Sequence, residues 1–393
     1  MATDAAYRIV ILGGYGQFGT RIVRWLAREA GCHIVVAGRH PGQAASLVAD
    51  IERTGASAGL SAARLDSESP DFAAQIVALR TDLLIHTAGP FTDPTYRVAR
   101  ACIEAGANYI DLADNRAFVL GIGDLQAAAR EKGLLVVSGA STVPAVSAAV
   151  VDHYRGRFTR IDTIDIGITP GSRAPRGLST IASVLTYCGK PFRRWQGGSW
   201  RQVYGWQDLH GVRYPELGTR WFANCDIPDL ELFPARYAVG QSVTFAAALE
   251  LGVMQFGVWA MSWLVRSGLV KSWLPAAALL KAASDPLAHF GSDRGGMHVR
   301  IAGIDANGRA HHVEWFLIAG SGDGPTIPCI ASIVIARKLA RRELWGLEPG
   351  ASGAMPCVDM LTLEEFQSAV EGLDIRYVER GTSQSPPVVE FPF

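Results

Sequence analysis

The residues with the clearest chemical pattern are three glycines near the N-terminus. Gly14, Gly16 and Gly19 match G-x-G-x-x-G and directly follow the apolar run Tyr7–Gly13. Glycine has no Cβ, so this spacing lets the backbone turn tightly and approach a pyrophosphate, which the N-terminus of a following helix also attracts. The pattern predicts a dinucleotide-binding turn. The competing interpretation is a tight strand-to-helix turn without a ligand.

Two later positions bear on which dinucleotide would bind. Arg39 ends the second apolar run, where a cation favours the 2′-phosphate of NADP and an acidic residue would favour the ribose hydroxyl of NAD. His40 follows it and could add a donor. Asp66 could accept a hydrogen bond from the adenine amino group, or it could be an ordinary turn residue. We therefore predict NADP(H), with a solvent-facing Arg39 and an NAD-dependent protein as the alternative.

The first 145 residues alternate between expected strands and expected helices. The expected strands are Tyr7–Gly13, Cys32–Ala37, Ala62–Leu65, Asp82–Thr87, Tyr109–Leu112 and Leu134–Ser138. Each is a short apolar run followed by a helical pattern, the order that builds a mostly parallel, doubly wound sheet. The fold class is therefore α/β, with a Rossmann-type domain over residues 1–145.

Several segments together resemble the saccharopine dehydrogenase-like oxidoreductases, also called the saccharopine reductase family. They are GGYGQFG (Gly13–Gly19), VVAGR (Val35–Arg39), HTAGPF (His86–Phe91) and ACIEAGANYIDLAD (Ala101–Asp114). Looser likeness continues in Gly291–Gly303 and in Gly324–Pro328. The resemblance implies an NADP-binding Rossmann domain, with a second α+β domain inserted before a C-terminal return.

The resemblance also implies a set of cofactor residues. It adds a loop near the cofactor to the glycine motif and Arg39. The predicted cofactor-binding residues are Gly14, Tyr15, Gly16, Gln17, Phe18, Gly19, Arg39, His40, Asp66, Ala88, Gly89 and Pro90. Ser141–Pro144 falls where many relatives have Gly-Phe-Asp-x-x-Pro, so the aromatic and acidic residues of that motif are absent here. The family name therefore does not predict the substrate.

A reductase often needs a group that protonates the substrate. Tyr96, Asp114 and Ser141 are the catalytic candidates, because each lies close to the end of an expected strand. His86 and Asp111 occupy similar positions, but His86 lies in an apolar strand and reads as structural. Asp111 or Asp114 could instead anchor a loop. Water or the substrate itself could also supply the proton, so these alternatives stay open.

Composition narrows the class of protein. The chain has 393 residues with 37 basic and 37 acidic side chains, so its formal net charge is zero, which argues against a nucleic-acid partner. Its six cysteines form no C-x-x-C pair, which indicates reduced thiols and a cytoplasmic protein without a metal site. His311 and His312 are neighbours on an expected strand and face opposite ways. We expect a small-molecule substrate and a homodimer.

The second half predicts an α+β domain over residues 146–325. Met297–Ile304 and Ala310–Ile318 flank an Asn-Gly turn, a strong hairpin signal for an antiparallel sheet. We expect residues 326–393 to return to the Rossmann domain.

One apolar stretch stands out in that domain. Val243–Val265 contains a single charge, Glu250, and Gly268–Ala283 is nearly as apolar. A membrane span does not fit, because the pattern of one domain continues on both sides. We expect an apolar helical hairpin over 243–283 that forms core or dimer interface, the wall of an apolar substrate pocket, or a peripheral membrane contact.

These observations leave two functions. The first is an NADP(H)-dependent oxidoreductase acting on a C=N, C=O or C=C bond of a small molecule, with apolar compounds as one class. The second is a regulatory or membrane-docking protein that binds NADP(H) without turnover.

Overall fold

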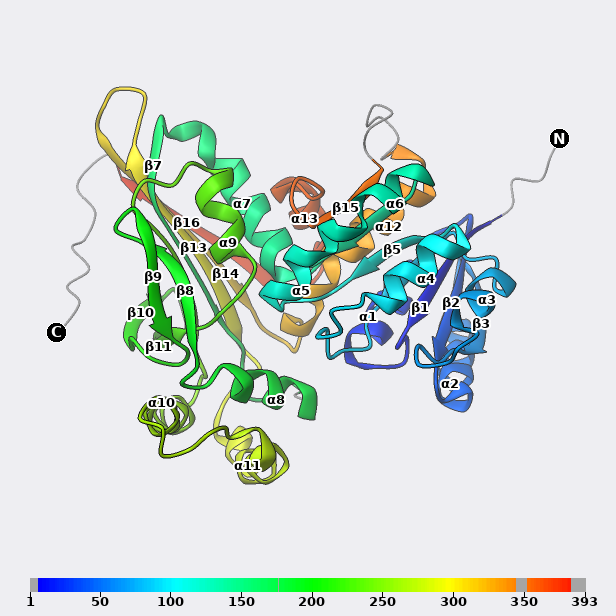
Figure 1. The fold of residues 1–393 in the computed structure, drawn as a ribbon, viewed down its shortest axis with the longest axis horizontal. Coiled ribbons are helices and arrows are strands. Elements are labelled where there is room, and N and C mark those ends of the chain that lie inside the picture. The colour runs from blue at the N-terminus through cyan, green and yellow to red at the C-terminus, as the bar shows by residue number, and fades with distance from the viewer. Residues whose placement is uncertain (1–5, 176, 344–351, 383–393) are drawn as a thin grey trace. The chain divides into compact units, whose positions relative to one another are not determined.

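The computed structural model describes residues 6–175, 177–343 and 352–382. The chain divides into two compact units. The first comprises residues 1–146 and 326–369, and the second comprises residues 147–325 and 370–393. Figure 1 shows the elements of both.

The first unit is built on a seven-stranded sheet in the order β15-β6-β5-β4-β1-β2-β3. Every neighbouring pair in it is parallel. Its strands are β1 (Tyr7–Leu12), β2 (Cys32–Gly38), β3 (Gly59–Arg64), β4 (Leu83–His86), β5 (Asn108–Asp111), β6 (Leu135–Ser138) and β15 (Gly353–Pro356). Strands β1 and β4 carry fully buried Ile and Leu side chains, as expected for a sheet covered on both faces.

The helices of this unit cover the sheet in two groups. Helix α1 packs on α12 and α12 packs on α13, while α3 packs on α4. The helices are α1 (Gln17–Leu26), α2 (Pro41–Thr54), α3 (Phe72–Ala78), α4 (Arg97–Ala105), α5 (Arg116–Gly121), α6 (Gln126–Glu131), α12 (Ile330–Ala340) and α13 (Leu363–Ala369). The predicted doubly wound α/β fold is confirmed.

The turn from β1 into α1 is the tightest point of this unit. Gly13 has a φ of +83°, which side chains rarely adopt, and its carbonyl oxygen accepts the Gly16 N–H at 2.8 Å. A Cβ on Gly19 would lie 2.2 Å from that same oxygen and 2.7 Å from the Cα of Gly14. Only a glycine at position 19 lets α1 begin so close to the end of β1.

The second unit is built on a mixed sheet. Its main path runs β10-β11-β12-β7-β13-β14-β16; off this path β8 pairs with β12, and β9 pairs with β8. Only β7 and β12 pair in parallel along that path. The strands are β7 (Arg160–Thr169), β8 (Pro191–Gln196), β9 (Ser199–Tyr204), β10 (His210–Tyr214), β11 (Gly218–Asn224), β12 (Ser242–Ala247), β13 (Gly295–Ile304), β14 (Ala310–Ala319) and β16 (Ile375–Thr382).

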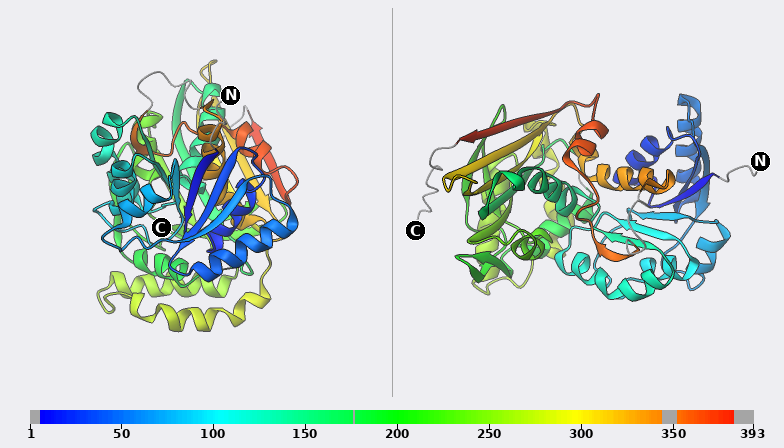
Figure 2. Two further views of the ribbon diagram at one scale, coloured as in Figure 1. Left: turned by 90° about the vertical axis from the view of Figure 1, so that its right-hand side faces the viewer. Right: turned by 90° about the horizontal axis from the view of Figure 1, so that it is seen from above.

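Several α-helices within the described residues accompany this sheet (Figure 2). They are α7 (Ser147–Tyr154), α8 (Leu178–Tyr187), α9 (Asp229–Arg236), α10 (Gly252–Arg266) and α11 (Ala277–Ser284). The predicted hairpin around the Asn-Gly turn is β13 and β14, which pair antiparallel over their whole length.

The predicted C-terminal return needs correction. Residues 326–369 do join the first unit, but β16 pairs antiparallel with β14 and so completes the second sheet. Alternating residues of β16 fit the free edge of the hairpin, a non-local pairing that local sequence does not show. Residues 344–351 and 383–393 of the predicted return lie outside the described residues.

The predicted apolar helical hairpin over 243–283 is also wrong in part. Its first residues form β12, because Val243 and Phe245 are buried in the sheet beside β7. The remainder forms α10 and α11, but α10 packs on β11 and α11 packs on α8. No helix within the described residues is long and apolar enough to cross a membrane.

The glycine turn gives a stability prediction. Gly19→Ala would force a Cβ against the Gly13 carbonyl, so we expect the free energy of unfolding to fall by about 1–3 kcal/mol. Gly42→Ala is the matched control, because nothing lies within 4 Å of a Cβ there. That helical position should be neutral or gain up to about 1 kcal/mol. Urea unfolding of both variants measures this, and equal stabilities would contradict the packing argument.

Candidate functional site

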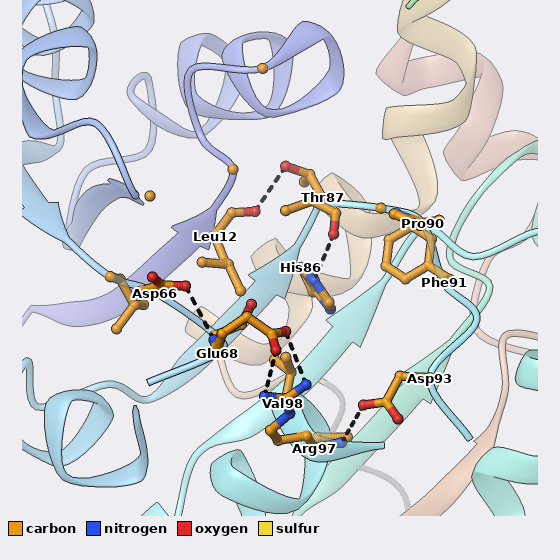
Figure 3. Close-up of a pocket in the computed structure, with 18 of the residues that line it drawn as sticks. Leu12, Asp66, Glu68, His86, Thr87, Pro90, Phe91, Asp93, Arg97 and Val98 are labelled. Atoms are coloured by element: carbon orange, nitrogen blue, oxygen red, sulfur yellow. Dashed lines mark hydrogen bonds and ion pairs between the residues drawn. The ribbon is translucent and has the colours of Figure 1, made fainter. Parts of the chain in front are cut away.

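A cleft of about 470 Å³ lies at the carboxyl ends of the first unit's parallel strands (Figure 3). Its walls come from the ends of β1, β2 and β4, the loop after β3, and the start of α4. Of the predicted cofactor residues, those that line it are Tyr15, Gly16, Arg39, Asp66, Ala88, Gly89 and Pro90. Ligands of open parallel sheets bind at this edge.

The other predicted residues lie behind or beside this lining. Those that do not line the cleft are Gly14, Gln17, Phe18, Gly19 and His40. Gly14 and Gly19 shape the turn instead, and Gln17 begins α1. Among the catalytic candidates, Tyr96 lines the cleft, whereas the exposed Asp114 and the buried Ser141 do not. Of the three catalytic candidates, only Tyr96 therefore lies at the cleft.

Tyr15 is held against the end of β2. A Cβ on Gly38 would lie 2.5 Å from the Tyr15 hydroxyl oxygen, so the missing side chain leaves room for this ring. The hydroxyl accepts a hydrogen bond from the His40 backbone N–H at 3.0 Å. Helix α2 begins one residue later at Pro41. Tyr15 therefore connects the glycine turn to the N-terminus of α2.

Arg39 is exposed between these two features and lines the cleft. It forms no hydrogen bond or ion pair with any residue that the structure describes. Its charge and the positive end of the α2 dipole lie together at this edge. The arrangement suits an anion such as a phosphate group.

An ion pair between Arg97 and Glu68 forms another wall of the cleft, at the loop after β3 and the start of α4. The Arg97 guanidinium contacts both carboxylate oxygens of Glu68, at 2.8 and 2.9 Å. The Asp66 carboxylate in turn accepts the Glu68 backbone N–H at 3.1 Å. Figure 3 shows this chain running from the loop after β3 to the start of α4. Arg97 neutralises the charge of Glu68. The second carboxylate oxygen of Asp66, Oδ2, can accept a hydrogen bond from a ligand.

The other end of the cleft is aromatic. The rings of Phe91, Tyr96, Tyr109 and Phe118 line it together with Pro90. Tyr96 donates its hydroxyl proton to the Phe118 carbonyl at 2.9 Å. Its phenol is therefore committed to the backbone and holds two walls of the cleft together. A flat, weakly polar ring fits such a wall.

His86 sets the conformation of the loop that follows β4. Burial lowers the pKa of His86 to about 4, so the ring is neutral near pH 7. Nε2 lies 3.1 Å from the Ala88 carbonyl, which can only accept, so Nε2 carries the proton. Nδ1 then accepts from the Tyr109 hydroxyl at 3.1 Å. The predicted structural role of His86 agrees with this geometry.

Asp111 joins the ends of two neighbouring strands beneath the cleft. Its Oδ1 accepts hydrogen bonds from the Ala113 N–H, the Ser138 hydroxyl and the Gly139 N–H at 2.9–3.0 Å. The side chain is fully buried, and burial raises its pKa to about 6 in spite of these bonds. Asp111 is therefore a loop anchor, one of the two readings of its sequence position.

Several lining residues escaped sequence reasoning. Glu68, Arg97 and Phe118 belong to no quoted motif, and Tyr109 lies in the Ala101–Asp114 segment without having been assigned a role; each reaches the cleft through the fold. The His86–Phe91 segment was the available signal, because it marks the loop that Tyr109 supports through His86. Within the described residues, no group of three His, Cys, Asp or Glu side chains could hold a metal ion.

Comparisons with known proteins bear on the family and on the fold. Residues 9–137 match the model of the saccharopine dehydrogenase NADP binding domain. Saccharopine dehydrogenase (L-Glu forming) from Saccharomyces cerevisiae has the same fold, with a TM-score of 0.63, 13% identity, and coverage of 95% of this chain and 100% of that chain. An amine dehydrogenase from Mycobacterium smegmatis gives a TM-score of 0.44 at 13% identity, with 90% and 96% covered. Curated proteins give no match.

The match confirms the resemblance to the saccharopine dehydrogenase-like family. It also supports an oxidoreductase with a nicotinamide cofactor.

The buried carboxyl gives a pH prediction. A folded pKa of about 6, above the unfolded value of about 4, means that Asp111 stabilises the fold below pH 4 and that this contribution is lost as pH rises through 6. Asp111→Asn keeps an acceptor at Oδ1 but cannot ionise. Relative to this variant, the wild type should lose up to about 3 kcal/mol of unfolding free energy between pH 4 and 7.

Urea unfolding across that pH range measures the difference. Glu104→Gln, a change at an exposed acid of α4, is the control and should leave the pH profile unchanged. A constant difference between the wild type and Asp111→Asn at all pH values would refute the shift.

Proposed function

We propose that this chain is an NADP(H)-dependent oxidoreductase, because residues 9–137 match the model of the saccharopine dehydrogenase NADP binding domain. It transfers a hydride to or from a C=N, C=O or C=C bond of a small molecule, and apolar compounds are included among its substrates. The bound nicotinamide supplies the hydride chemistry. The residues of the chain bind and orient that cofactor.

Arg39 is the observation that carries the proposal. Its exposed guanidinium lines the cleft beside the N-terminus of α2, without a hydrogen bond or ion pair to the described residues. An acidic residue there would accept from the ribose of NAD, whereas a cation binds the 2′-phosphate of NADP. The unpaired guanidinium of Arg39 therefore suits the 2′-phosphate of NADP better than the ribose hydroxyls of NAD.

The remaining groups fit the other parts of the cofactor. The Gly14–Gly19 turn and the N-terminus of α1 suit the pyrophosphate. Asp66 suits the adenine amino group, and the loop Ala88–Pro90 with its aromatic neighbours suits the nicotinamide ring. Since Tyr96 donates to the Phe118 carbonyl, we assign it a positioning role, with substrate protonation left to water or to the substrate itself.

Charge reversal at the phosphate position tests the cofactor preference. Arg39→Asp should weaken NADPH binding by about 10- to 100-fold, because a charge-assisted hydrogen bond is worth about 1.5–3 kcal/mol. NADH binding should change little or improve. Arg28→Asp, at an exposed arginine outside the cleft, is the matched control. Equal losses for both cofactors would contradict the assignment.

Turnover tests the reaction class. The purified protein with NADPH should oxidise it, measured by loss of reduced-nicotinamide absorbance, with some member of a panel of carbonyl, imine and enoyl compounds of increasing apolar length. Arg39→Asp should require more NADPH for the same rate. Tight NADPH binding without oxidation by any compound would instead favour the regulatory protein that binds NADP(H) without turnover.

A further inference from the structure

Helix α10 of the second unit carries apolar side chains on both its inward and its outward face, since Val258 and Met261 pack on the core cluster around Trp206. Its fully buried residues include the polar Gln255 and Ser262, which accept from the Leu249 N–H and donate to the Trp259 carbonyl. Its exposed residues other than the terminal Arg266 are apolar or glycine, with Val253 66%, Phe256 42% and Trp263 44% exposed. A surface helix normally places its polar residues outward.

The exposed apolar positions of α10 follow one helical face. They are Val253, Phe256, Gly257, Ala260, Trp263 and Leu264, at spacings of three and four residues. Trp221 of β11 contacts Phe256, with ring centroids 5.7 Å apart, yet Phe256 stays 42% and Trp221 itself 42% exposed. Such a regular outward pattern marks a contact surface and not scattered surface hydrophobes.

Further apolar side chains are exposed in the segment that follows α10. Leu269 is 77%, Leu274 45% and Leu279 72% exposed. Figures 1 and 2 place α10 and α11 at the same end of the second unit. We call the surface formed by Val253, Phe256, Trp263, Leu264, Leu274 and Leu279 the α10–α11 face.

The charged side chains within the segment 251–284 are all basic. They are Arg266, Lys271 and Lys281, with no Asp or Glu. Arg266 lies over the rings of Tyr204 and Trp263, at 4.1 and 4.9 Å, so a cation borders the exposed aromatic surface directly. Lys271 is exposed, and Lys281 pairs with Asp285 just beyond the segment.

The geometry points to the surface of an anionic phospholipid bilayer as the occupant of the α10–α11 face. Exposed Trp, Phe and Leu beside Lys and Arg are the features of helices that lie in a membrane interface. The cations complement anionic headgroups, whereas a two-fold contact with a second copy would bring these like-charged side chains together. No helix in the described ranges could span the bilayer, so the helices lie on it.

Vesicle flotation tests this docking. The full chain should float with phosphatidylcholine vesicles that contain phosphatidylglycerol, and several-fold less with phosphatidylcholine alone or at high salt. The double variant Phe256→Asp/Trp263→Asp should need at least ten times more vesicle lipid to reach the same bound fraction. Val77→Asp changes an equally exposed apolar residue in the first unit and is the control.

Charge reversal provides a second, gentler variant. Lys271→Glu should weaken binding only to vesicles with phosphatidylglycerol, and Lys132→Glu, at an exposed lysine of the first unit, should not. Thermal unfolding of each variant verifies that it is folded. The assay contains no NADPH, so its outcome is independent of the proposed oxidoreductase activity.

Three results would overturn the proposal. They are no flotation of the wild type, unchanged flotation of Phe256→Asp/Trp263→Asp, or an equal loss in Val77→Asp. Light scattering distinguishes the competing occupant. If the wild type is a dimer that ignores vesicles and the double variant is a monomer, the face binds a second copy and not lipid.

Discussion

The close approach of Gly19 to the carbonyl oxygen of Gly13 is the constraint on which the cofactor cleft depends. Because no Cβ separates them, α1 begins directly above the end of β1 and its positive N-terminus borders the cleft. The same turn places Tyr15 against Gly38, where its hydroxyl meets the start of α2. Two helix N-termini thus share one edge of the sheet, and both favour negative charge.

One end of the cleft contains charged side chains, and the other end is held by hydrogen bonds between neutral groups. At one end Arg39 remains without an ionic partner among the described residues, while Arg97 is paired with Glu68. At the other end the neutral His86 is fixed by Tyr109 and by the Ala88 carbonyl, so that loop is held by hydrogen bonds and not by charge. Among the described residues the cleft therefore offers an unpaired Arg39 and an aromatic wall, the features on which the proposal of a phosphorylated dinucleotide rests.

Sequence could predict those features that depend on local geometry. The glycine spacing and the position of Arg39 at a strand end are local, and both lie where the pattern placed them. β12 could not be predicted, because the apolar run from Val243 fits a buried strand as well as a helix until β7 lies beside it. The pairing of β16 with β14 and the reach of Tyr109 to His86 are tertiary contacts without a local signature.

An equilibrium titration of the wild-type protein with NADPH and with NADH tests the central claim most directly. The ten tryptophans provide a fluorescence signal, and the shift of the unfolding midpoint with ligand gives an independent readout. Saturable binding of NADPH at concentrations at least tenfold below those needed for NADH is the predicted result. Binding of neither, or tighter binding of NADH, would contradict the account of Arg39 and of the cleft.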